Sequence, residues 1–327
     1  MRRSAGFALR SSSTTAATFE DIGLGAELCR AMRQMGHDTP TDIQRAAIPH
    51  LLEGGDTVVG SHTGSGKSLA FMLPLLERQR RWEASVSGGG RIKPRPQRPR
   101  SIILAPTREL VTQIVGVAKT VGRASPFRVT SLVGGGGQKR QRSALHSAGV
   151  DMLVATPQQL QQQHAERKLF LTDLRTVVVD EADTMLCPKS GHADDVLALL
   201  NSARHMRARG GGGGGGGASD DRNSAASRGV QLIAVGATLD RATRRDLLAA
   251  MPGAAFLTTD SMHRLPGSLV QRFAKAGMGG EKLASLLDVV APLKELPTII
   301  FCHSSSSCRY VVETNRDYSL PLRSIRS

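Results

Sequence analysis

The sequence predicts an α/β fold in which helices cover both faces of a parallel sheet. The first observation is an alternation: six short apolar runs are each followed by a longer segment compatible with a helix. The second is that these runs are continuously apolar, which is typical of strands buried on both faces of a parallel sheet. The third is length, because 327 residues suffice for one large domain or two smaller ones with a sizeable core.

The expected strands are followed by residues of reactive types. In chain order the strands lie at 57–60, 101–105, 128–133, 151–155, 175–179 and 231–235. Ligands of parallel sheets bind outside the carboxyl ends of the strands. Polar or charged side chains follow five of the six strands, namely Lys67, Thr107, Thr156, Asp180 and Thr238. We therefore expect one functional site at one edge of one sheet.

The segment after the first strand, SHTGSGKS, has the composition of a phosphate-binding loop. A glycine-rich turn that leads from a strand into a helix points backbone N–H groups at a phosphate, and the helix dipole favours the anion. Gly64 and Gly66 would form the turn, Lys67 would reach the β- and γ-phosphates, and the Ser68 hydroxyl would ligate Mg²⁺. Ser61 stands where the common motif has glycine, which weakens the match only if that position requires a positive φ.

Two acidic residues support the same chemistry. Asp180 and Glu181 end the strand at 175–179, so one carboxylate is available for Mg²⁺ and one for the attacking water. The glycine-rich loop and this acidic pair together predict a nucleotide-binding site.

The chain is strongly basic. Its 43 Lys and Arg against 28 Asp and Glu give a net charge of +15, which indicates a polyanionic partner, nucleic acid first and an anionic membrane second. A solvated basic surface is the alternative. No apolar run approaches the roughly 18 residues that cross a bilayer, so we expect a soluble protein without a membrane partner. The four cysteines fit no zinc pattern and indicate free thiols in a reducing compartment.

Three segments are expected to lie outside the packed core. Residues 1–18 form a basic arm rich in Ser, Thr and Arg, which is the composition of an organellar transit peptide. We expect mitochondrial import, with a disordered basic arm as the alternative. The segments 83–100, rich in Gly, Pro and Arg, and 207–229, which contains the glycines 210–217, are expected to be flexible surface insertions.

The order of these motifs resembles that of the DEAD-box ATP-dependent RNA helicases over roughly residues 19 to 310. The strand at 175–179 leads into Asp-Glu-Ala-Asp, the quartet that names the family, and SHTGSGKS resembles its motif I, which commonly starts with Ala or Ser. Phe19 and the stretch GHDTPTDIQ resemble the Q motif. Further similarities are to motif Ia at 106–110, the GG element at 134–135, motif Ib at 156–157, motif III at 236–238 and motif IV near 299.

The resemblance implies a RecA-like first domain, with ATP and Mg²⁺ as cofactors and RNA as partner. Lys67, Asp180 and Glu181 would be catalytic, and Mg²⁺ would be held by Ser68 and, through water, by Asp180. Nucleotide contacts are implied for Phe19, which would stack, for Gln44, which would read the adenine edge, and for Ser61, Thr63, Gly64, Ser65, Gly66, Lys67 and Ser68. RNA backbone contacts are implied for Pro106, Thr107, Arg108, Gly134, Gly135, Thr156 and Pro157, and coupling of the two sites for Asp183, Gly236, Ala237 and Thr238.

Three features depart from the family pattern. Gln158 and Gln159 stand where motif Ib has Gly-Arg, and Gly236 stands where motif III begins with Ser. The sequence reaches Ser327 shortly after motif IV, without the arginine-rich motif of a second domain. We therefore expect a RecA-like domain at 19–260, followed at 261–327 by a linker and an incomplete second RecA-like domain.

The function predicted on these grounds is that of an ATP-dependent RNA helicase that binds the RNA backbone without sequence specificity and remodels duplexes. An aromatic content of 3% agrees with backbone-directed binding rather than base reading. The alternatives are an ATP- and RNA-binding fragment without turnover and, more distantly, a P-loop ATPase that acts on DNA or protein. Proteins of RNA processing or ribosome assembly are expected as further partners, and the nucleus, nucleolus or cytoplasm as alternative locations.

Overall fold

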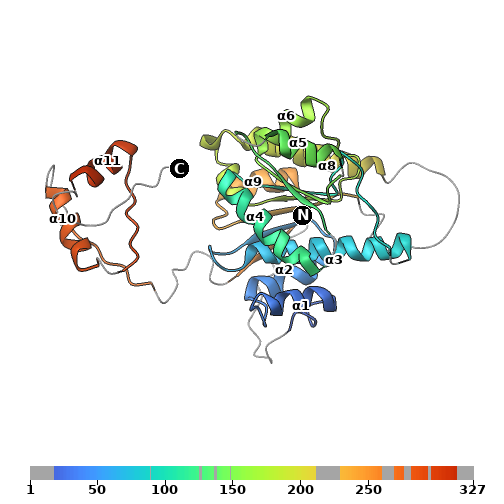
Figure 1. The fold of residues 1–327 in the computed structure, drawn as a ribbon, viewed down its shortest axis with the longest axis horizontal. Helices are drawn as coiled ribbons and strands as arrows, with labels where there is room; N and C mark the ends of the chain where they lie inside the picture. The colour runs from blue at the N-terminus through green and yellow to red at the C-terminus, as the bar shows by residue number, and fades with distance from the viewer. Residues whose placement is uncertain are drawn as a thin grey trace, which may run out of the picture. The chain divides into compact units, whose positions relative to one another are not determined.

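A seven-stranded, all-parallel sheet organises the first part of the chain in the computed structural model (Figure 1). The structure describes residues 18–88, 90–124, 127–135, 138–147, 149–210, 229–259, 269–275, 281–293 and 296–314. The spatial order of the strands is β3-β4-β2-β5-β6-β1-β7. Their bounds are β1 Thr57–Gly60, β2 Ser101–Leu104, β3 Val129–Leu132, β4 Met152–Ala155, β5 Thr176–Val179, β6 Gln231–Gly236 and β7 Ala255–Thr258.

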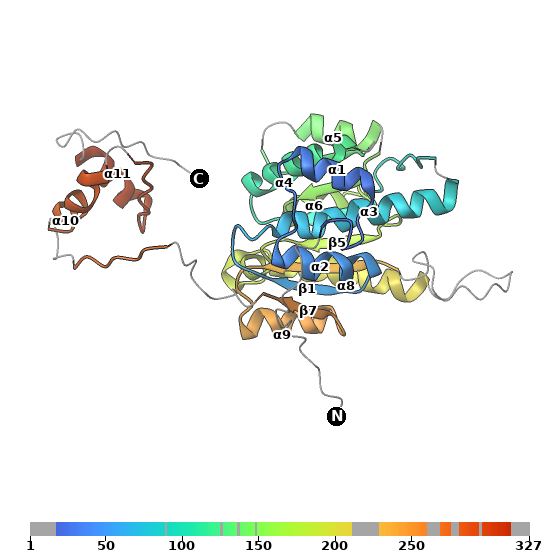
Figure 2. The ribbon, with the colours of Figure 1, turned by 90° about the horizontal axis from the view of Figure 1, so that it is seen from below.

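The strand β7 is the one strand of this sheet that the sequence pattern did not predict. It follows a Pro-Gly turn and pairs with β1 at the end of the sheet (Figure 2). The other six strands occupy the expected apolar runs, and β1, β2, β4, β5 and β6 are buried along their whole length. Burial on both faces explains why these runs are continuously apolar.

Helices cover the two faces of the sheet in two sets (Figure 1). The helices α1 to α4 pack with Val59, Ile103 and Val178 in one hydrophobic cluster. The helices α5 to α9 pack with Val58 and Ile102 in a second cluster on the opposite face. The bounds are α1 Ala26–Gln34, α2 Asp42–Glu53, α3 Lys67–Ser87, α4 Arg108–Val121, α5 Gln138–Ser147, α6 Pro157–Ala165, α7 Ala182–Met185, α8 Ala193–Gly210 and α9 Arg241–Ala250.

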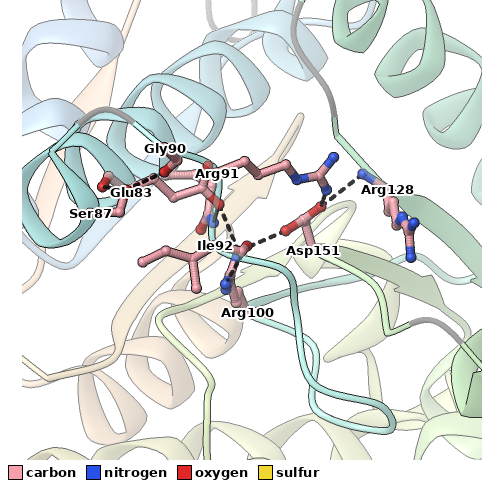
Figure 3. A network of polar contacts seen from close by, with 9 residues as sticks. Glu83, Ser87, Gly90, Arg91, Ile92, Arg100, Arg128 and Asp151 are labelled. Atoms are coloured by element: carbon pink, nitrogen blue, oxygen red, sulfur yellow. Dashed lines mark hydrogen bonds and ion pairs between the residues drawn. The ribbon is translucent and has the colours of Figure 1, made fainter.

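The segment 83–100 differs from the flexible insertion expected from its composition. Its first residues continue α3 to Ser87, and residues 90–100 are tied to the domain by buried polar contacts (Figure 3). Asp151, which is 2% exposed, accepts hydrogen bonds from Arg91 Nη2 at 2.6 Å and Arg100 Nη1 at 2.9 Å. Its carboxylate also accepts from Arg128 N at 2.8 Å. The composition was misleading because a buried acid, distant in sequence, supplies the partner that the arginines need.

Most of the expected insertion at 207–229 lies outside the described residues, as do residues 1–17 of the basic arm. Residues 207–210 continue α8. No helix in the described ranges is both long and apolar enough to span a membrane.

The chain divides into two compact units, Met1–Leu265 and Pro266–Ser327. In the described parts of the second unit the structure shows the helices α10, Glu281–Val290, and α11, Ser305–Thr314. The segment that resembles motif IV leads into α11. Phe273 and Phe301 in this unit are 93% and 92% exposed. The hydrophobic clusters that support the site are formed by residues of the first unit.

Candidate nucleotide-binding site at the carboxyl edge of the sheet

The expected phosphate loop connects the end of β1 to the start of α3. Gly64 and Gly66 have φ values of +80° and +90°, and Gly66 is the N-cap of α3. A Cβ on Gly66 would also lie 2.5 Å from Gln44 Nε2, so this position is restricted to glycine by both conformation and space. Ser61 is buried and does not have a positive φ. Serine is therefore compatible with the first position of the loop.

Lys67 lies inside the loop, close to the acidic residues of the site. Its Nζ donates hydrogen bonds to the carbonyl oxygens of Ser61 at 2.5 Å and His62 at 2.7 Å. Burial lowers the pKa of Lys67, and the nearby charges of Asp180, Asp183 and Glu181 oppose that shift. The ammonium group is thus placed where phosphate oxygens could replace the two carbonyl oxygens.

Asp180 is the buried carboxylate at the end of β5. Burial raises its pKa to about 6, against the opposing effect of the hydrogen bond from Glu181 N to its Oδ1, 3.0 Å long. A carboxylate held in a poorly solvated position gains strongly from a nearby cation. Glu181 is exposed and adopts a left-handed backbone conformation with φ 49°. Such strain at a residue other than glycine is typical of functional sites.

Asp183 connects the loop after β5 to the loop after β6. Its Oδ2 accepts hydrogen bonds from Ala237 N at 3.1 Å, Thr238 N at 2.8 Å and Thr238 Oγ1 at 2.7 Å. A Cβ on Gly236 would lie 3.4 Å from Asp183 Oδ1. Gly236 has no hydroxyl where the family carries serine. The Asp183 carboxylate nevertheless holds the loop after β6 through three other donors.

Gln44 lies beside the phosphate loop, whereas Phe19 lies in the core. Gln44 Oε1 accepts a hydrogen bond from Thr41 N at 3.0 Å, and Gln44 Nε2 donates to Gly66 O at 3.1 Å. Thr41 Oγ1 donates to Ser65 O at 2.9 Å, so the start of α2 is tied to the phosphate loop at two points. Phe19 is 2% exposed and belongs to the core. Its ring therefore has no open face on which an adenine could stack.

Sequence reasoning missed three residues of this loop environment. Thr41 could have been found, because Thr-x-x-Gln before an apolar run is a capping-box signature. His62 contributes only a carbonyl oxygen, and Thr259 contributes a hydroxyl 3.0 Å from Ser61 Oγ. Backbone oxygens and partners almost 200 residues away in the sequence leave no local signal.

The residues with expected RNA contacts gather beside this site. Thr107 caps α4, since its side chain accepts a hydrogen bond from Leu110 N at 3.2 Å. The guanidinium of Arg108 lies against Gly135, where a Cβ would come 2.6 Å from Arg108 Nη1. Pro106 comes directly before Thr107 in the loop that follows β2.

Motif Ib lies next to the same glycines. Thr156 and Pro157 begin α6 directly after β4. Gln159, which departs from the family pattern, has its amide 3.7 Å from the Cβ position of Gly134. The neutral amide of Gln159 thus lies next to Gly134 at the carboxyl edge of the sheet. Thr63 lies in the loop between β1 and α3, and Ser68 is the second residue of α3.

Strand order separates the two groups of residues along one edge. The loops after β1, β5 and β6, which are neighbours in the sheet, carry the phosphate loop, the acidic quartet and the segment 236–238. The loops after β2, β3 and β4, also neighbours, carry Thr107, Gly134 and Thr156 with their surroundings. The fold and this edge together define a P-loop nucleotide-binding domain with a second, adjoining polar surface.

Comparison with known proteins agrees with this class. The family model for the DEAD/DEAH box helicases matches residues 41–246. The chain is 32% identical over 298 residues to DEAD-box ATP-dependent RNA helicase 39 of Arabidopsis thaliana, covering 90% of this chain and 44% of that protein. It is 30% identical over 307 residues to the probable ATP-dependent RNA helicase DDX28 of Homo sapiens, covering 90% and 53%.

Solved structures show the same fold. The S. cerevisiae Dbp5 structure bound to RNA and ADP BeF3 matches with a TM-score of 0.69 and 23% identity, over 93% of this chain and 67% of that one. A DEAD box protein from Methanococcus jannaschii matches with a TM-score of 0.58 and 22% identity, over 92% and 70%. The chain belongs to the DEAD/DEAH box helicase family, and it spans about half the length of the curated relatives named above.

Proposed function

We propose that this chain binds Mg-ATP at the β1–β5–β6 part of the edge and an RNA backbone at the β2–β3–β4 part, as the working core of an ATP-dependent RNA helicase. The observation that carries the proposal is the contact of Asp183 with Ala237 and Thr238, since it connects the acidic quartet to a second loop of the same edge. Bound Mg-ATP would supply the phosphoanhydride bond whose hydrolysis drives RNA remodelling.

The residues of the loop fit a phosphate ligand and a hard cation. The Ser65 hydroxyl is buried without a hydrogen-bond partner among the described residues, in the loop where phosphate donors are expected. Lys67 would hold the phosphates, and Ser68 and Asp180 would hold Mg²⁺, Asp180 through water. The exposed carboxylate of Glu181 would orient a water molecule and accept its proton.

Gln44 would be the residue that recognises adenine and so distinguishes ATP from GTP. Its amide would have to exchange the hydrogen bond to Gly66 O for one to the base. Gln44→Ala tests this directly, since the preference for ATP over GTP should fall. Equal competition by both nucleotides against the wild type would remove this role.

The RNA part of the site would contact sugar and phosphate rather than bases. Arg108 supplies a guanidinium, and Gly134 and Gly135 allow close approach of a backbone. Such contacts carry no sequence information, so binding should tolerate any RNA sequence.

The test is a fluorescent-ATP titration together with phosphate release from ATP, measured with and without RNA, on wild-type protein and on Lys67→Ala. Lys119→Ala, which removes an exposed lysine from the last turn of α4, is the matched control. We expect RNA-stimulated release for the wild type and the control, and loss of ATP binding for Lys67→Ala. Unchanged ATP affinity of Lys67→Ala would refute the site.

For location, the composition of residues 1–18 supports mitochondrial import. A fluorescent fusion of these residues should enter mitochondria, and a fusion that stays in the cytosol would refute the assignment. RNA affinity that collapses when the arm is deleted would favour an RNA-binding arm instead. RNA-processing or ribosome-assembly proteins are the further partners that this function implies.

A further inference from the structure

A large cavity lies at the edge of the sheet opposite the phosphate loop. Its volume is about 1110 Å³. Arg100, Arg175 and Val230 line it, and they come directly before β2, β5 and β6. The cavity is therefore at the amino ends of the strands, whereas the proposed ATP and RNA sites are at the carboxyl ends.

The lining combines apolar side chains with a strong excess of positive charge. Six Arg and Lys side chains face one acid, Asp173. Asp173 is an ion-pair partner of Arg95. Trp82 and Phe170 add aromatic side chains to the same lining, and Arg100 and Arg98 lie over their rings at 4.9 Å and 4.8 Å. An apolar cavity with surplus cations is suited to a compact anion that also carries an apolar or aromatic body.

Arg175 is the cation best placed to bind such a ligand. Its guanidinium carbon lies 3.6 Å from the centre of the Trp82 ring, a stacked cation–π contact that holds the side chain in one plane. Burial, and then the charge of Arg100, lowers the pKa of Arg175 to about 10, so the group remains a cation at neutral pH. Within the described residues Arg175 has no ion pair, and the same is true of Lys93 at the exposed rim.

The lining next to Arg175 is held by several hydrogen bonds. Arg100 donates to Glu83 at 2.8 Å and to Ile92 O at 2.8 Å, and Asp151 anchors it from behind (Figure 3). A cavity with a fixed wall and an unpaired, stacked guanidinium needs little rearrangement to bind an anion. The stacked guanidinium also offers a planar face to a base, because bases stack on arginine planes as well as on aromatic rings.

We propose that this cavity binds a nucleotide unit, with its phosphate on Arg175 and Lys93 and its base against the aromatic and guanidinium surfaces. The unit could be a free nucleoside monophosphate or the 5′-phosphorylated end of an RNA strand, since both present the same chemistry. An acidic peptide fits less well, because it has no aromatic plane for the stacked face of Arg175.

The chain contains a single tryptophan, Trp82, so its fluorescence reports on this cavity alone. The measurement is a fluorescence titration in a Lys67→Ala background, which removes the proposed ATP site from the result. The probes are AMP, a short RNA with a 5′-phosphate, the same RNA with a 5′-hydroxyl, inorganic phosphate and a polyglutamate peptide. Arg175→Met and Lys93→Met are the test variants, and Arg30→Met, at an exposed position of α1, is the control.

We expect AMP or the 5′-phosphorylated RNA to change the Trp82 emission in a saturable way. Arg175→Met should weaken binding at least roughly tenfold, because a hydrogen bond to a charged group is lost. Lys93→Met should weaken it to a smaller extent, and Arg30→Met should leave it unchanged. AMP binding without RNA binding would identify a free nucleotide as the ligand, and a requirement for the 5′-phosphate of the RNA would identify the strand end.

Three results would overturn the proposal. The first is no saturable response to either nucleotide probe, and the second is tighter binding of polyglutamate or equal binding of inorganic phosphate. The third is unchanged affinity in both Arg175→Met and Lys93→Met. Lys93 is exposed, so its variant tests the site even if Arg175→Met fails to fold. The ATPase assay uses protein with an intact Lys67, so its result tests the proposed function independently of these outcomes.

Discussion

Replacing Asp180 by asparagine should stabilise the protein at neutral pH while removing its capacity to hold Mg²⁺. Asp180 is 5% exposed, and burial is the largest cause of its raised pKa. Asparagine has nearly the same shape and carries no charge. Its Oδ1 can keep the hydrogen bond from Glu181 N. Asp180→Asn therefore removes the unfavourable burial of a charge and keeps the Glu181 N–H hydrogen-bonded.

The magnitude follows from the difference in pKa between the folded and unfolded states. The pKa rises from 3.8 to about 6 on folding, which corresponds to about 3 kcal/mol at 1.36 kcal/mol per pKa unit. Because the folded pKa is the higher one, the wild type is most stable below the unfolded pKa and loses this stability as the pH rises through the folded pKa. Roughly 2 kcal/mol of the loss should fall between about pH 4.5 and pH 7.

The assay is urea unfolding at pH 4.5 and at pH 7, without nucleotide or Mg²⁺, followed by the fluorescence of Trp82. The difference in free energy of unfolding between Asp180→Asn and the wild type should be larger at pH 7 than at pH 4.5, by roughly 2 kcal/mol. Asp38→Asn, which replaces an exposed acid, should show no such pH dependence. An equal difference at both pH values would refute the reasoning, and so would Mg-ATP affinity unchanged from wild type in Asp180→Asn.

Three further changes test other contacts of the first unit. Asp183→Asn should lower the free energy of unfolding by about 1–2 kcal/mol in urea, because the charge that strengthens three hydrogen bonds is lost; an unchanged midpoint would mean that the loop with Thr238 is held by other contacts. Gly66→Ala should weaken ATP at least roughly tenfold in a fluorescent-nucleotide titration, because φ is +90° and Gln44 Nε2 lies 2.5 Å from the new Cβ, and wild-type affinity would contradict this. Asp151→Ala should cost about 3–5 kcal/mol in urea unfolding, because two arginines lose a buried partner, and a loss below about 1 kcal/mol would show that solvent reaches them.

The class of fold and the chemistry of the loops can be predicted from the amino-acid sequence. Buried parallel strands need continuous apolar runs, and those runs are visible in the chain without any contact information. The phosphate loop and the acidic quartet are short and contiguous, so their residue types and spacing are preserved in the sequence. For the same reason the sequence alone raised the question of whether position 61 requires a positive φ. The structure shows that the φ of Ser61 is not positive.

Which of these loops are neighbours, and what each side chain contacts, depends on the tertiary structure. The order β3-β4-β2-β5-β6-β1-β7 divides the edge into two groups of adjacent loops, and no local pattern encodes that order. Gln44 lies beside the phosphate loop through its hydrogen bond to Gly66 O, whereas Phe19, which was expected to stack on the base, lies in the core. The segment 90–100 is held by Asp151, 51 residues from Arg100 in the sequence. The physical reason is the same in each case: composition and spacing report on local conformation, whereas burial and pairing depend on residues that the fold brings together from far apart in the chain.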